Sequence, residues 1–316
     1  MSKYEVASHS RIESLQACKI PLQKHWGRYT VAHTTKDMAF YGFPKCGFST
    51  IRDVVRLLHG TEGGRACDPS CVKASKRRRI LFARNPIDRF VSGWCESERV
   101  CSFESKKSNN YTFGSQTWAL QNWGNWHILS NSSRHATGIK SMSRRAQERF
   151  NAFVQAFFKW AGDDISNPRT FPEDSGMCLN GINRLRGHLM SQIQYTCSTA
   201  VQGKVKTEGE ICGGDFSNDY MGNVETMSSE LFGLTGVDPV KEALYSRASR
   251  QQWSNEGTSL NRSHIDDPQV PRVPHPSFPR HFFPALCALY RDDFCCLGFP
   301  TPKECSNICS EPPEWY

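Results

Sequence analysis

The segment 41–52 reads Tyr-Gly-Phe-Pro-Lys-Cys-Gly-Phe-Ser-Thr-Ile-Arg, which combines the end of a strand, a tight turn and the start of a helix. The run Met38–Phe43 is apolar enough to form a buried strand. Pro44 ends that strand, and Gly47 allows the backbone to turn closely around a ligand. This order of residues predicts a strand–loop–helix unit.

The helix is predicted to begin directly after the loop. Ser49 and Thr50 stand at N-cap positions, ahead of the amphipathic run Ile51–Leu58. A helix that begins there directs backbone N–H groups and the positive end of its dipole at the loop, and Lys45 adds a positive charge. The loop is therefore predicted to bind an anion. Because its lysine precedes the glycine, it differs from the Gly-x-x-x-x-Gly-Lys-Ser/Thr loop of nucleoside triphosphatases.

A second strand–loop–helix unit follows. The run Arg79–Arg84 is a predicted strand, and Asn85-Pro86 opens a helix over Ile87–Trp94. Arg84 is thereby left at the carboxyl end of the strand, and Ser92 lies two turns along the helix. In an open α/β sheet, ligands bind beyond the carboxyl ends of the strands, where we expect the two loops to meet.

The two segments resemble the motifs with which sulfotransferases bind 3′-phosphoadenosine 5′-phosphosulfate (PAPS). Pro-Lys-Cys-Gly-Phe-Ser-Thr (44–50) resembles the loop that binds the 5′-phosphosulfate. Arg-Asn-Pro-Ile-Asp-Arg-Phe-Val-Ser-Gly-Trp (84–94) resembles the 3′-phosphate motif, in which an arginine and a serine hold the 3′-phosphate. Both motifs occur in the order and spacing of the family.

Three further stretches resemble the Golgi carbohydrate sulfotransferases (sulfotransferase family 2), the group related to the HNK-1 and chondroitin 4-O enzymes. The segment 219–227 resembles their aromatic-x-Gly-x-x-Glu-Thr-Leu stretch, and the segment 290–299 resembles their C-terminal Tyr-x-x-Asp-Phe block. The segment 183–197 is similar to their acceptor-side His-x-x-Pro-Gln…Cys motif, with Ser191 where proline is usual. The resemblance therefore extends over roughly residues 38–300.

The resemblance implies a P-loop-like sulfotransferase fold of the α/β class, in which helices flank a central, mostly parallel sheet. The sulfotransferase domain would span residues 38–300, between an N-terminal arm (1–37) and a Cys- and Pro-rich tail (301–316). Phe48 is larger than the usual residue of the family, and Val224 replaces an aromatic or long side chain. These departures leave the expected cofactor unchanged but make the acceptor harder to define.

The resemblance also implies that PAPS is the co-substrate, and no metal is implied. The residues expected to bind PAPS are Pro44, Lys45, Cys46, Gly47, Phe48, Ser49, Thr50, Arg84 and Ser92. Lys45 is the expected catalytic cation at the bridging oxygen, because a positive charge there helps the transition state more than the ground state. Arg84 offers the 3′-phosphate a bidentate fork, although an ion pair with Asp88 is the purely structural alternative.

The general base and the acceptor are less well defined. His188 opens the acceptor-side motif and is the expected catalytic base, with His59 and His127 as competitors. Glu225 either orients the substrate or only complements a helix dipole. Three tryptophans can stack on sugar rings or serve as core residues: Trp118, Trp123 and Trp126.

The charge of the chain suits an acidic ligand. An excess of 39 Lys and Arg over 31 Asp and Glu gives a net charge of +8, which fits PAPS and an acidic glycan, although it is also ordinary for solubility. The basic run Lys73–Arg79 has no accompanying nucleic-acid motif, and we interpret it as a solvated approach to the strand or a positive rim. A carbohydrate acceptor is expected, and nucleic acid is not; a tyrosyl or small-molecule acceptor stays open.

Fourteen cysteines favour disulfides, and therefore an oxidising compartment, over zinc. The cysteines cluster near loops and the tail as Cys67…Cys71, Cys295-Cys296 and Cys305…Cys309, with a pairing that the sequence leaves open. Cys46 and Cys95 are candidates for buried thiols.

The expected location is the Golgi lumen or the secretory pathway, with a cytoplasmic location as the alternative. No apolar stretch reaches the ~18 residues that span a bilayer, and Met1–Lys19 lacks the apolar centre of a signal peptide. Members of the family usually carry an N-terminal anchor, so either an anchor is missing from this sequence or this member is located elsewhere. Sequons at Asn110, Asn131 and Asn261 permit N-glycosylation.

The remaining chain is predicted from its composition and periodicity. Residues 101–138 are rich in Ser, Asn and Gly and are predicted to form a long loop or an acceptor-side insertion. The run 145–161 has helical spacing, with an apolar face expected in the core. Further helices are predicted over 240–253 and 281–294.

These observations favour a PAPS-dependent carbohydrate O-sulfotransferase. A P-loop phosphotransferase is the first alternative, but it would require a lysine after the glycine and a Mg²⁺-binding aspartate at a strand end. A non-catalytic nucleotide- or glycan-binding protein on the same fold is the second alternative.

Overall fold

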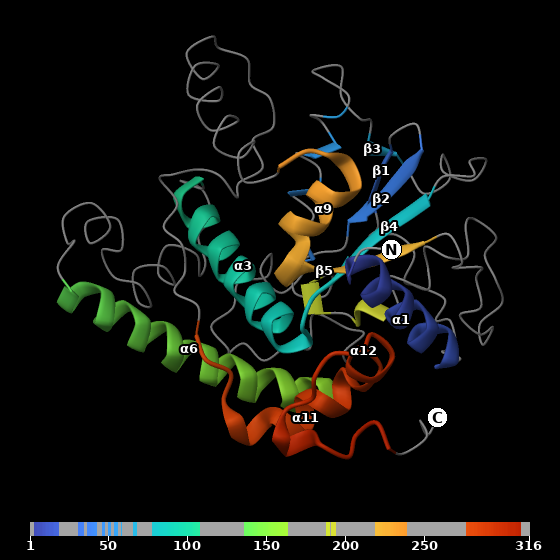
Figure 1. Ribbon diagram of the computed structural model, residues 1–316. Coiled ribbons are helices and arrows are strands. Elements are labelled where there is room, and N and C mark those ends of the chain that lie inside the picture. Colours follow the sequence, from blue (N-terminus) through green and yellow to red (C-terminus); the bar gives the residue numbers. More distant parts are fainter. Residues whose placement is uncertain are drawn as a thin grey trace, which may run out of the picture. The chain divides into compact units, whose positions relative to one another are not determined.

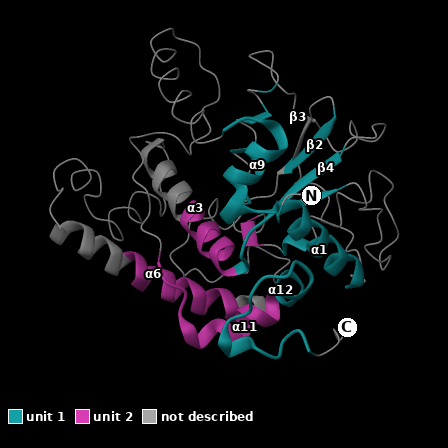
Figure 2. Ribbon diagram, in the orientation of Figure 1, with its two compact units in different colours: residues 1–86, 190–260, 290–316 teal, residues 87–189, 261–289 magenta. Residues whose placement is uncertain are grey.

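The computed structural model describes residues 3–18, 31–34, 37–42, 46–47, 50–51, 54–55, 58, 66–67, 78–107, 136–163, 188–189, 191–193, 219–238 and 276–310 (Figure 1). The chain forms two compact units (Figure 2). Unit 1 comprises residues 1–86, 190–260 and 290–316, and unit 2 comprises residues 87–189 and 261–289. The predicted domain of residues 38–300 stays a prediction.

Unit 1 is built on a five-stranded sheet with the strand order β3-β1-β2-β4-β5. The strands are β1 (Val31–Thr34), β2 (Met38–Gly42), β3 (Ala66–Cys67), β4 (Arg78–Ala83) and β5 (Tyr220–Asn223). β2, β4 and β5 run parallel to one another, whereas β1 pairs antiparallel with both β2 and β3. The predicted α/β class is thus confirmed, with three strands in the parallel part of the described sheet.

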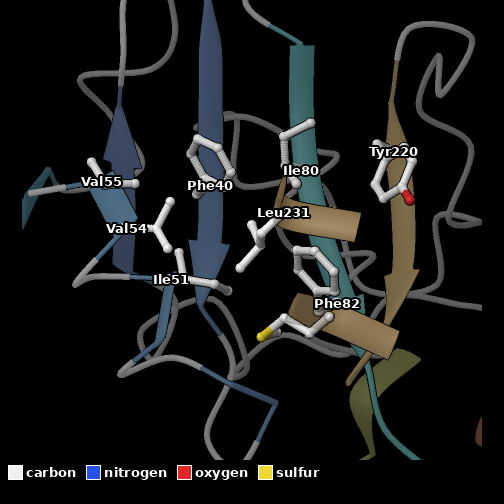
Figure 3. Packing of buried hydrophobic residues seen from close by; sticks show 9 residues of the cluster. Phe40, Ile51, Val54, Val55, Ile80, Phe82, Tyr220 and Leu231 are labelled. Carbon is white, nitrogen blue, oxygen red and sulfur yellow. The ribbon is translucent and has the colours of Figure 1, made fainter. Parts of the chain in front are cut away.

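The parallel strands bury one face under two helical segments. Phe40, Ile80 and Tyr220 are in register on neighbouring strands and lie side by side (Figure 3). The buried cluster on this face comprises Phe40, Ile51, Val54, Val55, Ile80, Phe82, Tyr220, Met227 and Leu231. A fully buried apolar side chain of this size stabilises the fold by roughly 1.5–3 kcal/mol, so this cluster is a main source of stability for the sheet.

Two helices follow strands that were predicted from the sequence. Residues 50–51, 54–55 and 58 are helical, which confirms the predicted helix after β2 at these positions. After β5, the 3₁₀ turn η5 (Val224–Thr226) leads into α9 (Met227–Thr235). Gly236 caps the C-terminus of α9 in the left-handed conformation, with a φ of 72°. Its N–H donates a hydrogen bond to the carbonyl of Phe232.

The described residues of the predicted N-terminal arm (1–37) include regular secondary structure. They contain β1 and also α1 (Lys3–Ala17), which lies along the edge strand β5. Ser8 Oγ accepts a hydrogen bond of 2.8 Å from the N–H of Met221, and Arg11 Nη1 donates one of 3.1 Å to the carbonyl of Met221. Side chains of α1 thereby satisfy backbone groups that the edge of a sheet otherwise leaves unpaired.

Unit 2 contains most of α3 (Pro86–Lys107), α6 (Ala136–Asp163), the 3₁₀ turn η8 (Arg280–Phe282) and α11 (Phe283–Leu289). The ring of Phe90 on α3 lies 5.1 Å from that of Phe157 on α6 and 5.5 Å from that of Phe278. The predicted apolar face of α6 is therefore core: Phe150, Phe153, Val154 and Phe157 are buried. None of the helices in the described part of the chain combines the length and apolar composition needed to cross a bilayer.

Two predictions for unit 2 and its neighbouring segment are corrected by the structure. The expected loop 101–138 is helical at both ends, since α3 continues to Lys107 and α6 begins at Ala136; residues 108–135 lie outside the described residues. The predicted helix 281–294 is divided into η8, α11 and α12 (Arg291–Cys296), because the chain bends at Tyr290. The predicted helix 240–253 lies outside the described residues.

The chain contains disulfides, as predicted. Cys18 at the end of α1 is bonded to Cys296 of α12, and Cys295 is bonded to Cys309. Cys287 and Cys305, which lies in the 3₁₀ turn η9 (Lys303–Cys305), are disulfide-bonded as well. Cysteines that form disulfides cannot bind zinc, so the zinc interpretation is wrong for these six residues.

Candidate functional site

The carboxyl ends of β2, β4 and β5 meet at one edge of the sheet. Tyr41 of β2 is paired with Leu81 of β4, and Ala83 of β4 is paired with Asn223 of β5. The segments that leave these ends therefore start side by side. This edge is where a parallel α/β sheet binds its ligands.

The loop after β2 turns at Gly47 as predicted. Gly47 has a φ of 76°, in the left-handed region that favours glycine, and its carbonyl accepts a hydrogen bond of 3.0 Å from the N–H of Ile51. A Cβ at this position would lie 2.1 Å from Cε of Met227 on α9. The turn thus leads directly into the helix, and its Cα is in close contact with a neighbouring element.

Several predicted site residues in this loop lie outside the described residues. They are Pro44, Lys45, Phe48 and Ser49. Thr50 is helical and half-buried, and Cys46 is fully buried and carries a thiol. The catalytic role of Lys45 therefore stays a prediction.

Gln192 connects this loop to the end of β4. Its Oε1 accepts a hydrogen bond of 2.7 Å from the N–H of Arg84 and one of 3.0 Å from the thiol of Cys46. Its Nε2 donates one of 2.6 Å to the carbonyl of Arg84. The structure therefore brings together two predicted site residues, Cys46 and Arg84, through one buried amide.

The carboxylate of Asp293 on α12 holds Gln192 in turn. Asp293 Oδ2 accepts from the N–H of Gln192 at 2.9 Å, and Oδ1 accepts from the N–H of Ile193 at 2.9 Å. The hydroxyl of Ser191 donates to Oδ1 at 2.5 Å. Ser191, which stands where the family usually has proline, thereby adds a hydrogen bond that proline cannot make.

A second buried carboxylate organises the turn after β5. Glu230 accepts hydrogen bonds from the hydroxyl of Tyr220 at 2.7 Å, from the N–H of Asn223 at 3.2 Å and from the hydroxyl of Thr226. Burial, followed by the bond to Glu230, raises the pKa of Tyr220 well above its usual range. Thr226, which bonds to Glu230, and Gly222, where a Cβ would collide with it, therefore have structural roles.

Glu225 lies at the same edge of the sheet and is exposed. Its N–H donates to Oδ1 of Asn223 at 3.2 Å, so Asn223 caps the 3₁₀ turn. One carboxylate oxygen of Glu225 lies 3.5 Å from the N–H of Asn85, just beyond Arg84. Glu225 thus presents a negative charge near the two loops, where both interpretations of its role stay open.

Ser92 and His188 belong to unit 2. Ser92 lies on α3 and is half-buried. His188 packs against the next residue of that helix, because a Cβ at Gly93 would lie 3.3 Å from Cβ of His188. The structure thus brings Cys46 and Arg84 together in one unit, and in the other it places His188 against Gly93, the residue after Ser92. The meeting of the two pairs stays a prediction.

The last two residues of the basic run 73–79 are engaged in ion pairs. Arg78 donates to both carboxylate oxygens of Glu5, at 3.1 and 2.8 Å, and Arg79 donates to Asp219 at 2.7 Å in a buried pair. Burial raises the pKa of the neighbouring Tyr41, with Arg79 opposing and Asp219 reinforcing the shift. Arg78 and Arg79 therefore stabilise the fold, and the positive rim predicted for this run does not include them.

Sequence reasoning assigned no role to Gln192, Asp293 or Glu230. Gln192 and Asp293 lie in the segments that resemble family motifs, and this position is the sequence feature that could have pointed to them. Each is polar and buried, which requires hydrogen-bond partners. Those partners lie far away in the sequence, so no local pattern identifies them.

Among the described residues, no group of His, Cys, Asp and Glu side chains is arranged to hold a metal ion. His59 and His127, the competitors of His188 as the base, lie outside the described residues, and so do the three tryptophans expected to stack on sugar rings or serve as core residues, Trp118, Trp123 and Trp126. Comparisons with protein-family models, with curated proteins and with solved structures give no match.

Proposed function

We propose that the protein is a PAPS-dependent sulfotransferase that transfers a sulfuryl group to a hydroxyl of a carbohydrate, on a P-loop-like sulfotransferase fold. The observation that carries this proposal is the turn at Gly47. It lies beyond the carboxyl end of β2, leads into a helix, and is joined through Cys46 and Gln192 to Arg84 at the end of β4. A glycine turn before a helix and an arginine at the next strand end are the two parts that the 5′- and 3′-phosphates require.

The proposed reaction is an in-line displacement at sulfur. The acceptor oxygen forms a new bond to sulfur while the bond from sulfur to the bridging oxygen breaks, and 3′,5′-bisphosphoadenosine leaves with the electron pair. Lys45 would stabilise the negative charge that develops on the bridging oxygen. His188 would take the proton of the acceptor hydroxyl as attack proceeds.

The binding roles follow from the same arrangement. Backbone N–H groups from Gly47 to Thr50 would bind the 5′-phosphate, because the first turn of a helix leaves such groups without intrahelical partners. Arg84 and Ser92 would bind the 3′-phosphate. Gly47 fits this role through its positive φ, a backbone conformation that lets the chain turn tightly just before the helix.

The disulfides are typical of a secreted or lumenal protein. Within that class, we propose the Golgi lumen as the location, because the carbohydrate sulfotransferases that this chain resembles act there.

Calorimetric titration with 3′,5′-bisphosphoadenosine tests the proposal, with ATP and Mg²⁺ as the comparison. We expect the bisphosphate to bind without metal and to bind more tightly than ATP. A preference for ATP and Mg²⁺ would instead support a phosphotransferase, and binding of neither nucleotide would contradict the proposal.

Two substitutions test the assigned residues. We expect Lys45→Ala to lower the turnover of sulfuryl transfer by about 10²–10³-fold, the effect of removing one group that stabilises transition-state charge. Arg84→Ala should weaken binding of the bisphosphate by ~2–5 kcal/mol, because it leaves a phosphate unpaired. The matched controls, Lys303→Ala and Arg280→Ala, remove exposed cations in η9 and η8 and should change neither quantity. Wild-type turnover in Lys45→Ala, or wild-type affinity in Arg84→Ala, would contradict the corresponding role.

A further inference from the structure

Asp293 and Gln192 form a buried hydrogen-bonded chain in unit 1, and both side chains are 0% exposed. The carboxylate of Asp293 accepts from three donors in the short segment 191–193: two backbone N–H groups and the hydroxyl of Ser191. Asp293 is about one hundred positions from this segment in the sequence, with a separation of 101 from Gln192. One carboxylate therefore determines the local conformation of residues 191–193.

The fixed backbone orients the amide of Gln192. Nε2 donates to the carbonyl of Arg84 and lies 3.5 Å from Oδ2 of Asp293, while Oε1 faces two donors, the N–H of Arg84 and the thiol of Cys46. An amide rotated by half a turn would place its NH₂ group against the N–H of Arg84. Only one orientation satisfies every partner, so the position of the amide is fully specified.

The two ends of this chain of hydrogen bonds are functional segments in the proposed enzyme. Cys46 belongs to the loop proposed for the 5′-phosphosulfate, and Arg84 begins the segment proposed for the 3′-phosphate. The amide contacts the backbone of Arg84 at both its N–H and its carbonyl. Gln192 thus sets the spacing between two residues, Cys46 and Arg84, that are 38 positions apart in the chain.

We propose that Asp293 and Gln192 are positioning residues: they hold the loop after β2 against the end of β4, so that both phosphate-binding segments are set before the nucleotide binds. We call the hydrogen-bonded pair of Asp293 and Gln192 the clamp. The identity of the ligand rests on the proposed function, whereas the clamp itself rests on the hydrogen bonds. Groups held in place before binding lose less conformational freedom when the ligand arrives, which favours affinity. Buried networks in which every member is satisfied are rigid enough for this purpose.

The clamp can be tested without any ligand, through the thiol of Cys46. This thiol is fully buried and bonded to Gln192, so its alkylation by iodoacetamide in the native protein reports opening of the loop. Gln192→Met keeps the length of the side chain and removes the amide. We expect it to accelerate alkylation of Cys46 by at least about tenfold, measured by mass spectrometry against the half-buried thiol of Cys95 in the same sample.

A matched control separates the clamp from general stability. Leu15→Ala removes a buried side chain of α1 that takes no part in the hydrogen-bonded chain, and it lowers the melting temperature of the same unit. Each variant is assayed at the same number of degrees below its own melting temperature. Under these conditions, Cys46 should react faster in Gln192→Met than in Leu15→Ala. Equal rates in the two variants would overturn the proposal. If Gln192→Met does not fold, Ser191→Ala removes one donor to Asp293 and should change the rate in the same direction, by less.

Affinity for 3′,5′-bisphosphoadenosine completes the test. We expect Gln192→Met and Asp293→Asn to weaken binding by about tenfold or more, and Leu15→Ala to leave it unchanged. If Cys46 opens in the clamp variants but the wild type binds no bisphosphate, the clamp stands and the proposed function fails. If the wild type binds and the clamp variants bind equally well, the proposed function stands and positioning by Asp293 and Gln192 is wrong.

Discussion

Gly222 lacks a side chain in a place where the space beside its Cα is already filled. A Cβ at this position would lie 2.2 Å from Oε2 of Glu230 and 2.4 Å from Cε1 of Phe82. Glu230 is buried and accepts hydrogen bonds from Tyr220, Asn223 and Thr226, so it cannot move away without losing them. Gly222 is therefore a glycine because the carboxylate of Glu230, which packs against β5, leaves no room for a side chain.

Two glycine substitutions are expected to have opposite effects on stability. Gly222→Ala should lower the free energy of unfolding by roughly 1–3 kcal/mol, because the methyl group overpacks a filled site. Gly233→Ala should raise it by about 0.5–1 kcal/mol, since Gly233 lies within α9 and a Cβ there has no atom within 4 Å. Urea unfolding of both variants measures the two changes, and a stabilising effect of Gly222→Ala would contradict the packing argument.

At the level of elements, α1 contributes more than its composition indicates. The helix is mostly polar, and of its side chains Ser8, Ile12 and Leu15 are buried. Its contacts with the rest of unit 1 include the hydrogen bonds to Met221 of β5 and the ion pair of Glu5 with Arg78 of β4. A mostly polar helix has no strong apolar periodicity, which is why the sequence pattern did not predict α1.

The ion pair between Glu5 and Arg78 makes the docking of α1 dependent on pH. Hydrogen bonds from Arg78 lower the pKa of Glu5, with burial opposing the shift. Because the folded-state pKa lies below that of the unfolded chain, the stabilisation is present above about pH 4.5 and is lost as the pH falls through the folded-state pKa. Both side chains are about one third exposed, so we expect the pair to contribute less than ~1 kcal/mol.

Glu5→Gln measures this contribution. The variant should have a lower free energy of unfolding than the wild type at pH 7, and the difference should decrease as the pH falls below 4.5. Glu13→Gln is the control, because Glu13 lies on the same helix but is 65% exposed. A difference for Glu5→Gln that stays constant as the pH is lowered would show that the ion pair is not its cause.

Across the whole molecule, the disulfide between Cys18 and Cys296 joins segments that are 278 positions apart. It connects the end of α1 to α12, the helix that also carries Asp293. A crosslink over such a distance restricts the unfolded chain strongly, and native disulfides of this kind typically contribute about 2–5 kcal/mol. The order of α1 in unit 1 is thus supported by a covalent bond as well as by contacts.

Replacement of both cysteines tests this contribution. The double variant Cys18→Ser/Cys296→Ser should unfold with a free energy lower by about 2–5 kcal/mol. Cys95→Ser, which replaces a half-buried thiol on α3, should have a much smaller effect. Similar losses in the two proteins, measured by chemical unfolding under oxidising conditions, would argue against a stabilising role for the bond.

The sequence alone determined the elements that depend on backbone preference and hydrophobic periodicity. The apolar runs predicted β2 and β4 to within one residue of the strands as described, and the turn at Gly47 and the buried face of α6 also followed from residue type and spacing. These features depend on backbone preference and periodicity, which a short window of sequence contains.

Only the tertiary structure decided how the candidate site is held together. The hydrogen bonds of Gln192 to Cys46 and Asp293 join positions separated by 146 and 101 residues, and the edge of β5 is covered by a helix from the other end of the chain. Buried polar groups need partners, but any donor or acceptor of suitable geometry can be that partner. Which polar groups become hydrogen-bond partners therefore depends on which segments the folded sheet brings to one edge. The periodicity of the sequence does not predict this.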